Sequence, residues 1–381
     1  MSFNKITFKS NLNSRRLHKE NDDARSPFQR DRDRIIHSNA FRRLAHKTQV
    51  FFTNNKHDHY RTRLTHSLEV SQISRSINSI LGGDENLTES IALSHDLGHP
   101  PFGHVGENIL NTIMHSLKNN GFNHNIQTLR IVTFLEQKYA LFDGLNLTYG
   151  SLEGILKHSG PINKVDDLNS PYYINFSKNY NISLNSQSSL ESQIAAISDD
   201  VAYNCHDIDD GFRAGLFDLD DLMQLELIRE KLEDIYKINK QIETSRIIHE
   251  LKRSLINALV MDIIKESQYR VKKYGIASYK DIVDNTDPIV VFSHKMELHL
   301  NEIRSFLGKN MYQNKKITED IDYAQVVIEG LFYFYKENLN KLPLKSEIIN
   351  YSELRVNRVI CDFISGMTDN YAIEKYKELI L

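Results

Sequence analysis

The chain contains no tryptophan and only two cysteines, Cys205 and Cys361, among its 381 residues. Two cysteines cannot form the disulfide framework of small secreted domains, so we expect a reducing compartment. No apolar run approaches the ~20 residues that cross a bilayer, and the N-terminus lacks the apolar centre of a signal peptide. These absences predict a cytoplasmic protein with no membrane partner.

Proline is also scarce, with seven residues in the chain, and strand signals are weak. The best of them is the short apolar run 289–292. Leu, Ile, Glu, Lys and Gln instead recur at helical spacing over long stretches. The sequence therefore predicts a predominantly α-helical protein, although its length alone would allow about two or three domains.

Charge of one sign is not in excess, since the formal net charge is only −3. That balance gives no global electrostatic case for nucleic-acid binding. Arginine is nevertheless concentrated near the N-terminus, where planar guanidinium groups suit phosphate recognition. The alternative is a solvated or intersubunit arm. The arginines concerned are Arg15, Arg16, Arg25, Arg30, Arg32, Arg34, Arg42 and Arg43.

Apolar periodicity and helix-ending residues place the expected elements. Gly82-Gly83 ends one helix, and the next leads directly into His95-Asp96. Polar composition predicts a loop around Asn54-Asn55 and an irregular excursion over 160–189. The predicted helices span about residues 30–44, 64–80, 88–94, 126–141 and 189–207, with further helical scaffold over 217–264 and in the last hundred residues.

Histidine is unevenly distributed, because ten of the 16 lie within residues 37–124. The segment 95–107 holds three imidazoles and two carboxylates, and His66 stands 29 residues before it. A lone histidine is usually structural, and a solvated face would favour Lys and Glu over imidazole. Adjacent His95-Asp96 can turn toward one ion at a helix end, where Gly98 supplies the break. The cluster indicates a metal-activated hydrolytic site.

One further predicted helix carries polar residues on a shared face. Asp199, Tyr203 and Asp207 recur at i, i+4 and i+8 within 189–207. Residues at this spacing lie above one another on a helix. We therefore expect the three side chains to face the same site.

These features occur together in one family. The order of His66, His95-Asp96 and Asp199 resembles the H…HD…D pattern of HD-domain metal phosphohydrolases. The flanking motifs are similar to those of deoxynucleoside triphosphate triphosphohydrolases, specifically the bacterial dGTPase-like group. Similarity runs from about Ser26 to Ala214 and is weaker beyond. The matching segments are Arg42-Arg43-Leu44, Lys47-Thr48-Gln49-Val50-Phe51, Arg63 to Val70, His95 to Glu107 and Asp199 to Asp210.

The resemblance implies an all-α fold, an HD-domain helical bundle extended by a C-terminal helical region. It implies an N-terminal arm over 1–30, an HD metal-dependent phosphohydrolase core over 31–215, and a helical C-terminal region over 216–381 packed on that core. It also implies a homo-oligomer, with the N-terminal arginines as candidate subunit contacts and an interface that can bind a regulatory nucleotide.

The implied cofactor is one divalent metal ion held by His66, His95, Asp96 and Asp199. Imidazole and carboxylate ligands suit Mn, Mg, Co, Fe or Zn, so its identity stays open. Asp200 is a rival for the last position. We prefer Asp199 because the family ligand stands four residues before a tyrosine, here Tyr203.

The implied catalytic residues are His104, Glu107, His99 and His124. His104 and Glu107 stand three apart, so on a helix the carboxylate can orient the imidazole for proton transfer. Whether His104 protonates the leaving oxygen or activates water stays open. The family commonly has a glutamate where this chain has Asn123, which puts the role of His124 in doubt.

Four further residues match substrate-binding positions of the family. Arg63 would bind the α-phosphate, and Gln49 and Asp207 would lie near the sugar 3′-hydroxyl. Tyr203 would pack against the deoxyribose and exclude a 2′-hydroxyl. The alternatives are that Gln49 is a turn residue and Tyr203 is ordinary core.

The predicted function is a dNTP triphosphohydrolase, with dGTP as a candidate substrate, that releases a deoxynucleoside and tripolyphosphate. One alternative is another HD phosphohydrolase acting on monophosphates, cyclic nucleotides or alarmones. The alarmone version is disfavoured because Leu97-Gly98-His99 stands where such hydrolases carry paired acidic residues. The other alternative is a regulatory protein that binds nucleotides or single-stranded DNA, which the N-terminal arginines would favour.

Overall fold

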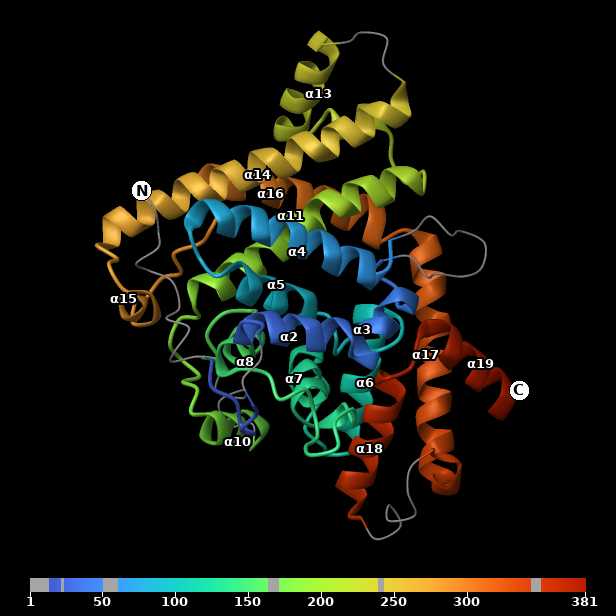
Figure 1. Ribbon diagram of the computed structural model, residues 1–381. Helices are drawn as coiled ribbons and strands as arrows, with labels where there is room; N and C mark the ends of the chain where they lie inside the picture. Colours follow the sequence, from blue (N-terminus) through green and yellow to red (C-terminus); the bar gives the residue numbers. More distant parts are fainter. Residues whose placement is uncertain (1–13, 22–23, 51–60, 164–170, 239–242, 344–350) are drawn as a thin grey trace.

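The computed structural model describes residues 14–21, 24–50, 61–163, 171–238, 243–343 and 351–381 (Figure 1). Within these ranges the regular elements are helices, and strand-like pairing is limited to one antiparallel bridge between Thr48 and Thr62. The all-α prediction is therefore confirmed. None of the helices in these ranges is both long and apolar enough to cross a membrane.

The first half of the chain forms the central bundle. Its helices are α2 (Pro27–Ile36), α3 (Asn39–Arg43), α4 (Arg63–Leu81), α5 (Glu85–Ser94), α6 (Gly103–Ser116), α7 (His124–Arg130), α8 (Tyr149–Leu156), α10 (Pro171–Tyr180) and α11 (Leu190–Arg213). Two short helical turns follow α3 and α7, η1 (Leu44–His46) and η2 (Ile131–Leu135).

The second half continues as helices packed on that bundle. They are α12 (Leu219–Leu222), α13 (Glu226–Ile238), α14 (Thr244–Tyr274), α15 (Tyr279–Val283), α16 (His294–Leu307), α17 (Lys315–Glu337), α18 (Glu353–Ser365) and α19 (Asp369–Leu379). The turns η3 (Gly308–Tyr312) and η4 (Leu339–Lys341) follow α16 and α17.

Three groups of buried apolar side chains hold the helices together. One packs α4, α5 and α11 against the C-terminal helices α13, α14 and α16. The second joins α2 and α3 to α7, α8 and α10, and the third joins α6 to α17, α18 and α19. Each fully buried side chain contributes about 1.5–3 kcal/mol. The second half is thus attached to the bundle at two places, along α14 and along α17 (Figure 1).

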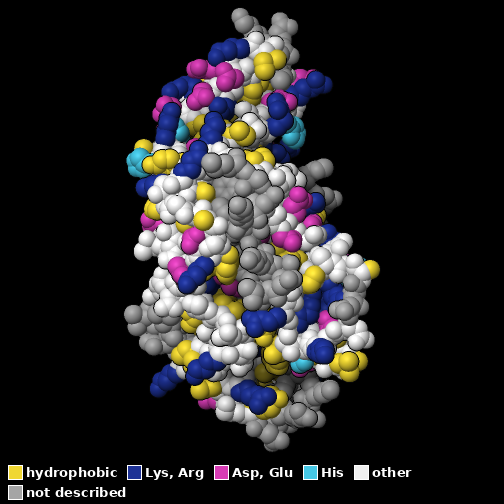
Figure 2. All heavy atoms as spheres, turned by 60° about the vertical axis from the view of Figure 1, so that its left-hand side comes forward, with side chains coloured by type: hydrophobic (Ala, Val, Ile, Leu, Met, Phe, Trp, Pro, Cys, Tyr) yellow, Lys and Arg dark blue, Asp and Glu magenta, His cyan; other side chains and the backbone are white. Residues whose placement is uncertain are grey.

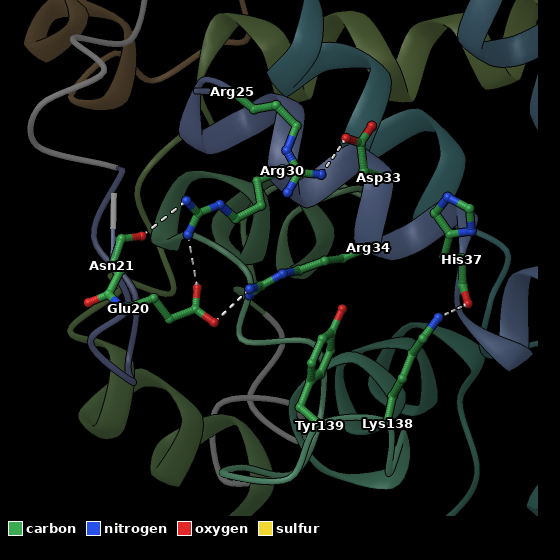
Figure 3. A pocket seen from close by; sticks show the side chains of 9 residues that line it. All are labelled: Glu20, Asn21, Arg25, Arg30, Asp33, Arg34, His37, Lys138 and Tyr139. Atoms are coloured by element: carbon green, nitrogen blue, oxygen red, sulfur yellow. Dashed lines mark hydrogen bonds and ion pairs between the residues drawn. The ribbon is translucent and has the colours of Figure 1, made fainter. Parts of the chain in front are cut away.

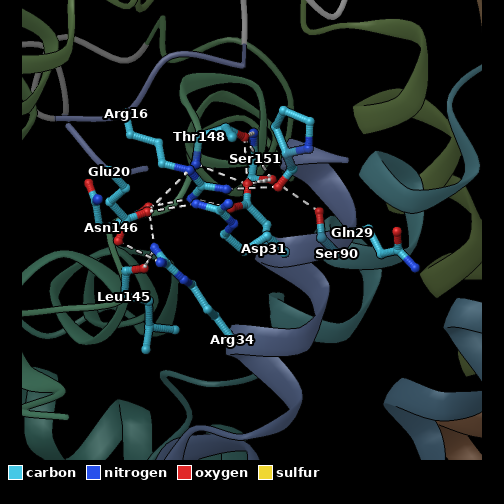
Figure 4. A network of polar contacts seen from close by, with 12 residues as sticks. Arg16, Glu20, Gln29, Asp31, Arg34, Ser90, Leu145, Asn146, Thr148 and Ser151 are labelled. Atoms are coloured by element: carbon cyan, nitrogen blue, oxygen red, sulfur yellow. Dashed lines mark hydrogen bonds and ion pairs between the residues drawn. The ribbon is translucent and has the colours of Figure 1, made fainter. Parts of the chain in front are cut away.

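A buried carboxylate fixes the N-terminal segment to the bundle (Figure 4). Asp31, in α2, is fully buried, and its Oδ1 accepts a hydrogen bond from Arg16 Nη1 at 2.6 Å. Its Oδ2 accepts from Ser151 Oγ at 2.7 Å and from the Thr148 backbone N–H at 2.9 Å. Arg16 Nη1 also donates to the Asn146 carbonyl at 2.5 Å. One of the N-terminal arginines therefore has a structural role inside the bundle.

Helices predicted over 64–80 and 189–207, and the one leading into His95, are confirmed as α4, α11 and α5. Gly82 ends α4 in the left-handed conformation, with φ 86°. The loop predicted around Asn54-Asn55 lies outside the described residues.

The single helix predicted over 30–44 is wrong, because the chain forms α2 and α3 there. The break falls at His37 and Ser38. Ser38 Oγ accepts a hydrogen bond from the Phe41 backbone N–H at 3.1 Å, which caps the start of α3. A serine that bonds to nearby backbone in this way competes with continuation of the preceding helix.

The helix predicted over 126–141 is too long. Helical structure ends at Leu135, after a π turn. Glu136 then directs its buried carboxylate to the Ala40 backbone N–H, at 2.7 Å. That buried hydrogen bond to the start of α3 replaces a further helical turn.

Two other expectations are corrected. The excursion over 160–189 was expected to be irregular, yet it contains α10, which buries Tyr173, Phe176 and Tyr180. The apolar run 289–292 is not a strand. The backbone N–H groups of Ile289 and Val290 donate instead to Gln193 Oε1, at 2.7 and 3.0 Å, so a side chain of α11 replaces a strand partner.

Candidate metal and catalytic site

Three helices bring the predicted metal ligands together. His66 lies in the first turns of α4, His95 and Asp96 follow the end of α5, and Asp199 lies in α11. His66 Nε2 lies 2.8 Å from Asp199 Oδ1, and His95 Nε2 lies 3.6 Å from the same oxygen. His95 Nε2 is 3.5 Å from Asp96 Oδ1. Donor atoms of His66, His95 and Asp96 lie within 4.8 Å of one another.

The donor atoms of this group suit a divalent cation. His95 Nδ1 lies 2.7 Å from the Ala92 carbonyl oxygen, so Nδ1 carries the hydrogen and Nε2 presents a lone pair to the cluster. His95 Nε2 and Asp96 Oδ2 are buried and have no hydrogen-bond partner within the described ranges. Buried polar atoms are normally satisfied, and a cation would satisfy both.

Both carboxylates of the cluster are negatively charged at neutral pH. Burial alone would raise the pKa of Asp96, but Arg63, His95 and His99 outweigh it and hold that pKa well below its ordinary value. Burial alone would also raise the pKa of Asp199, but nearby histidines, His95 foremost, lower it well below its ordinary value. Two carboxylates and two imidazoles form a donor set for a hard or borderline divalent ion.

Asp200 lies outside this group. Its side chain is 58% exposed and its Oδ1 is 3.9 Å from Arg304 Nη2. The geometry is consistent with the preference for Asp199 over Asp200.

Arg63 lies next to the cluster and has unused donors. Its Nη1 pairs with Asp96 Oδ1 at 2.9 Å, whereas Nε and Nη2 are buried and no described residue hydrogen-bonds to them. A Cβ at Gly103 would stand only 2.8 Å from Arg63 Nη2, and Gly103 has φ 58°. Glycine therefore leaves room for the guanidinium, whose free donors suit an anion such as phosphate.

His104, Glu107 and His124 form a second group at the start of α6 and α7. Glu107 Oε2 lies 3.1 Å from His104 Nδ1, and both Glu107 oxygens lie 2.9 Å from His124 Nδ1. Burial would raise the pKa of Glu107, but hydrogen bonds from His104 and His124 lower it below its ordinary value. The carboxylate therefore accepts from both imidazoles and leaves each Nε2 for other partners.

His99 lies between the two groups. Its Nδ1 is 3.0 Å from Asp96 Oδ1, and its ring stacks on that of His124 with centroids 4.0 Å apart. Burial, reinforced by the positive charge of Arg63, lowers the pKa of His99 well below its ordinary value, so the ring is neutral. His104 is the exposed member, with 65% of its side chain accessible.

Asn123 has a structural function in this chain. Its Oδ1 accepts hydrogen bonds from the backbone N–H groups of Asn125 and Ile126, at 2.9 and 3.2 Å, and so caps α7. The carboxylate that contacts His124 comes from Glu107 instead. His124 thus has an acidic partner although position 123 is an asparagine.

Of the other predicted substrate-binding residues, Tyr203 and Asp207 lie in α11, the helix that carries Asp199, and Gln49 lies in the chain before α4. Asp207 is buried; its Oδ2 accepts a hydrogen bond from Tyr312 Oη, and its Oδ1 has no partner in the described part of the chain. Tyr203 Oη lies 2.5 Å from Tyr312 Oη. Gln49 Oε1 is also buried and unpartnered among the described residues. Burial raises the pKa of Asp207 to about 7, although the hydrogen bond from Tyr312 opposes the rise.

Three residues of the site were not predicted from the sequence. Tyr312 lies in η3, more than a hundred residues beyond Asp207, and no local pattern marks it. His158 Nε2 lies 3.5 Å from Asp199 Oδ2, and its ring stacks on that of His95. His206 Nδ1 lies 3.2 Å from His66 Nδ1. His206 could have been found, because it stands seven residues after Asp199 and shares its helix face.

The C-terminal helices hold the catalytic segment in place. Lys47 Nζ donates to the His99 carbonyl at 2.5 Å and to the Ser365 carbonyl at 2.9 Å. Asp369, at the start of α19, accepts from the backbone N–H groups of Thr48, at 2.8 Å, and Phe102, at 3.0 Å. The histidine-rich segment is thus tied to the second half of the chain at Phe102 directly and at His99 through Lys47.

A cavity of about 640 Å³ opens beside Asp199. Its wall includes His158, Asp200, Val290 and Phe292. Ligand pockets for small molecules usually measure about 300–1,000 Å³ and combine apolar walls with a few polar groups. The cavity has the size and the mixed lining of such a pocket.

Comparison with other proteins agrees with this site. The HD domain family matches residues 63–204, and the phosphohydrolase-associated domain family matches residues 290–378. The chain is 46% identical over 366 residues to a deoxyguanosinetriphosphate triphosphohydrolase-like protein of Bartonella quintana, covering 93% of this chain and 89% of that protein. Proteins with the same name from Pelagibacter ubique and Parvibaculum lavamentivorans are 47% and 44% identical, over 93% and 96% of this chain and 93% of each relative.

These matches extend over nearly the whole chain and include both halves of the fold. The HD match begins at Arg63 and ends at Asn204, so it contains His66, His95-Asp96 and Asp199. The chain is therefore an HD-type phosphohydrolase and belongs to the deoxyguanosinetriphosphate triphosphohydrolase-like family.

Proposed function

We propose that this protein is a metal-dependent dNTP triphosphohydrolase that converts a dNTP, with dGTP as first candidate, and water into a deoxynucleoside and tripolyphosphate. One observation carries the proposal. Hydrogen-bonding atoms of Gln49, Arg63 and Asp207 are buried without a partner among the described residues, with Arg63 beside Asp96 and Asp207 on the helix that carries Asp199. A guanidinium, an amide and a carboxyl group suit phosphate on one side and sugar hydroxyls on the other.

The proposed metal ligands are His66, His95, Asp96 and Asp199. Held there, a divalent ion such as Mn, Mg, Co, Fe or Zn would acidify a bound water and polarise an α-phosphate oxygen. Arg63 would bind the same phosphate with Nε and Nη2, which have no hydrogen-bond partner among the residues that the structure describes. Its ion pair with Asp96 keeps the guanidinium beside the metal ligands.

We assign proton transfer to the group of His104, Glu107 and His124. Glu107 accepts a hydrogen bond from Nδ1 of each imidazole. Nε2 is therefore the atom of each ring that can exchange a proton with the phosphate ester. His99, neutral and buried between the two groups, is assigned a phosphate-positioning role. The exposure of His104 suits it to meet the leaving 5′ oxygen.

Preference for deoxynucleotides would come from Tyr203, Asp207 and Tyr312. Tyr312 donates a hydrogen bond to Asp207 and is hydrogen-bonded to Tyr203, so the two rings and the carboxyl group form one connected side of the site. In this proposal Asp207 Oδ1 and Gln49 Oε1 bind the 3′-hydroxyl. Tyr203 then occupies the space that a 2′-hydroxyl would need.

The substrate is tested with metal-loaded protein and a panel of dNTPs, rNTPs, monophosphates and cyclic nucleotides. We expect tripolyphosphate, detected by ³¹P NMR, from dNTPs only. Asp199→Asn should lower kcat/KM by at least about 100-fold, whereas the adjacent Asp200→Asn should retain most activity. Release of pyrophosphate or single phosphates without tripolyphosphate would sink the proposal, and faster turnover of a monophosphate or cyclic nucleotide would favour the alternative HD activity.

A second cavity supports the proposal of a homo-oligomer with a regulatory nucleotide at its interface. It measures about 540 Å³ and is lined by Arg25, Arg30, Arg34 and Lys138, among other residues (Figure 3). Arg30 and Arg34 converge on the carboxylate of Glu20, at 3.4 and 2.6 Å. A phosphate group could take the place of that carboxylate, because guanidinium groups bind both.

Single-stranded DNA has less support as a partner. Several N-terminal arginines are already engaged in ion pairs, such as Arg16 with Asp31 and Arg25 with Asp33. Basic and acidic side chains are also mixed over the upper part of the face in Figure 2. A continuous basic surface is the usual mark of strand binding.

A further inference from the structure

A series of polar contacts lies behind His66, on the side away from the metal cluster. His66 Nδ1 lies 3.2 Å from His206 Nδ1, and His206 Nε2 lies 3.0 Å from Glu69 Oε2. Glu69 Oε2 also accepts a hydrogen bond from Arg61 Nε at 2.8 Å. The series crosses from α4 to α11, which pack together (Figure 1), and leads from the partly exposed Glu69 to the buried His66.

With both imidazoles neutral, one arrangement of hydrogens satisfies every contact in this series. The Glu69 carboxylate, paired with a guanidinium, only accepts, so His206 Nε2 must carry hydrogen. A neutral imidazole carries one hydrogen, so His206 Nδ1 is a lone pair and His66 Nδ1 must donate to it. His66 Nε2 is then the lone pair. It faces Asp199 Oδ1 at 2.8 Å, an arrangement of two acceptors that calls for a cation.

The opposite arrangement fails at Glu69. If His66 Nε2 carried the hydrogen, His66 Nδ1 would accept from His206, and a neutral His206 would turn a lone pair toward the carboxylate. A doubly protonated His206 would place a positive charge at a residue that is 1% exposed. It would also stand beside the Arg61 guanidinium, a costly arrangement for a buried cation.

We propose that His206 and Glu69 are positioning residues, which hold His66 in its Nδ1-protonated tautomer and so present Nε2 to the metal ion. The inference rests on the proposed metal site. His95 reaches the same state by donating from Nδ1 to the Ala92 carbonyl, at 2.7 Å. The two imidazole ligands are thus oriented by different partners, a backbone carbonyl for His95 and a side-chain series for His66.

The test is the Mn²⁺ affinity of the purified full-length protein, measured by competition with a chelating dye. His206→Leu removes the acceptor of His66 Nδ1 and should weaken Mn²⁺ binding about 10–100-fold. His206→Gln should restore most of the affinity, because its amide oxygen accepts from His66 and its amide N–H donates to Glu69. Glu69→Leu, at a partly exposed position, should change the affinity in the same direction as His206→Leu. The matched control is Glu85→Leu, which removes a carboxylate of α5 that lies 3.2 Å from Arg75 of α4.

Proton NMR of the Co²⁺-loaded protein gives a readout independent of affinity. His66 and His95 should each show one hyperfine-shifted, exchangeable Nδ1–H resonance, and His206→Leu should broaden or shift that of His66 alone. If folded His206→Leu or Glu69→Leu binds Mn²⁺ as tightly as the original chain, the positioning role is wrong. If His66→Ala leaves Mn²⁺ affinity unchanged, the proposed metal site itself is wrong, and the two failures are therefore distinguishable.

Discussion

Asp207 illustrates, at the scale of single residues, how surroundings set a charge state. Its side chain is buried in α11, and burial raises its pKa to about 7 against the hydrogen bond from Tyr312. Near neutral pH the group therefore changes between a carboxyl that can donate and a carboxylate that only accepts. Any contact that it makes with a sugar hydroxyl depends on pH in this range.

We expect Asp207→Asn to reduce the pH dependence of stability. The ordinary pKa is 3.8, so the folded state holds this proton more tightly than the unfolded chain. The resulting stabilisation, at most about 4 kcal/mol, is complete below the ordinary pKa and is lost as pH rises through about 7. Melting temperatures at about pH 5 and about pH 8 should differ less for Asp207→Asn than for the original chain. Asp322→Asn, at an exposed position, is the control; equal pH responses in all three would contradict the expectation.

Residue types at fixed local spacing could be predicted, and contacts from distant segments could not. His66, His95, Asp96 and Asp199 were placed together by a motif, and the structure brings them within a few ångströms. Tyr312 meets Asp207 only because η3 folds back on α11, and periodicity does not encode such a meeting. Assignment of these residues to metal, phosphate and sugar stays a prediction.

At the scale of helices and turns, α19 supports the start of α6. Asp369 is 2% exposed and accepts from the backbone N–H groups of Thr48 and Phe102. Phe102 has φ 63°, a left-handed conformation that a non-glycine residue adopts only when its surroundings hold it. The turn that aims His104 at the site is therefore held by a helix more than 250 residues later in the chain.

We expect Asp369→Ala to destabilise the protein by about 2–4 kcal/mol, because two buried N–H groups lose their acceptor. Asp369→Ala should have a lower midpoint of urea unfolding than the original chain, and its kcat/KM should fall as the turn before His104 loosens. Glu378→Ala removes an exposed ion pair with Lys375 on the same helix and should change stability by less than about 0.5 kcal/mol. Equal midpoints for the two variants would show that Asp369 does not hold the turn.

Helices were predicted where apolar spacing was regular, and boundaries failed where side chains bond to backbone. Ser38 divides the helix predicted over 30–44, and Glu136 ends the helix predicted over 126–141 early. The helix α10 was missed, although Tyr173, Phe176 and Tyr180 stand at helical spacing, because polar residues dominate that stretch. Local capping chemistry and aromatic anchors account for these differences.

At the scale of the whole molecule, the arginine-lined cavity lies on α2 and the chain around Lys138 (Figure 3), and its lining includes none of the proposed metal ligands. Phe134 and Leu141, on the same stretch of chain as Lys138, are 51% and 90% exposed. Exposed apolar side chains beside a charged cavity are features that subunit interfaces cover. The proposed oligomer would bury them.

We expect light scattering to report a homo-oligomer, and a second dNTP to activate turnover of the first. Lys138 Nζ bonds only to the His37 carbonyl among the contacts of the described residues, so it is available for a phosphate. Lys138→Glu should raise the concentration of activating dNTP needed about tenfold. Lys265→Glu, at an exposed position of α14, should leave the required concentration of activating dNTP unchanged. If both variants respond like the original chain, the cavity is not the regulatory site.

Gly98 lies between His95 and Asp96 on one side and the groups around His124 on the other. Its surroundings leave no room for a side chain. Its backbone N–H donates to Thr128 Oγ1 at 2.9 Å. An added Cβ would stand 2.1 Å from the His124 carbonyl oxygen and 2.3 Å from the Thr128 nitrogen. Even an alanine here would force the segment after Asp96 away from the start of α7, so the distance between His95 and His124 depends on the absence of a single methyl group.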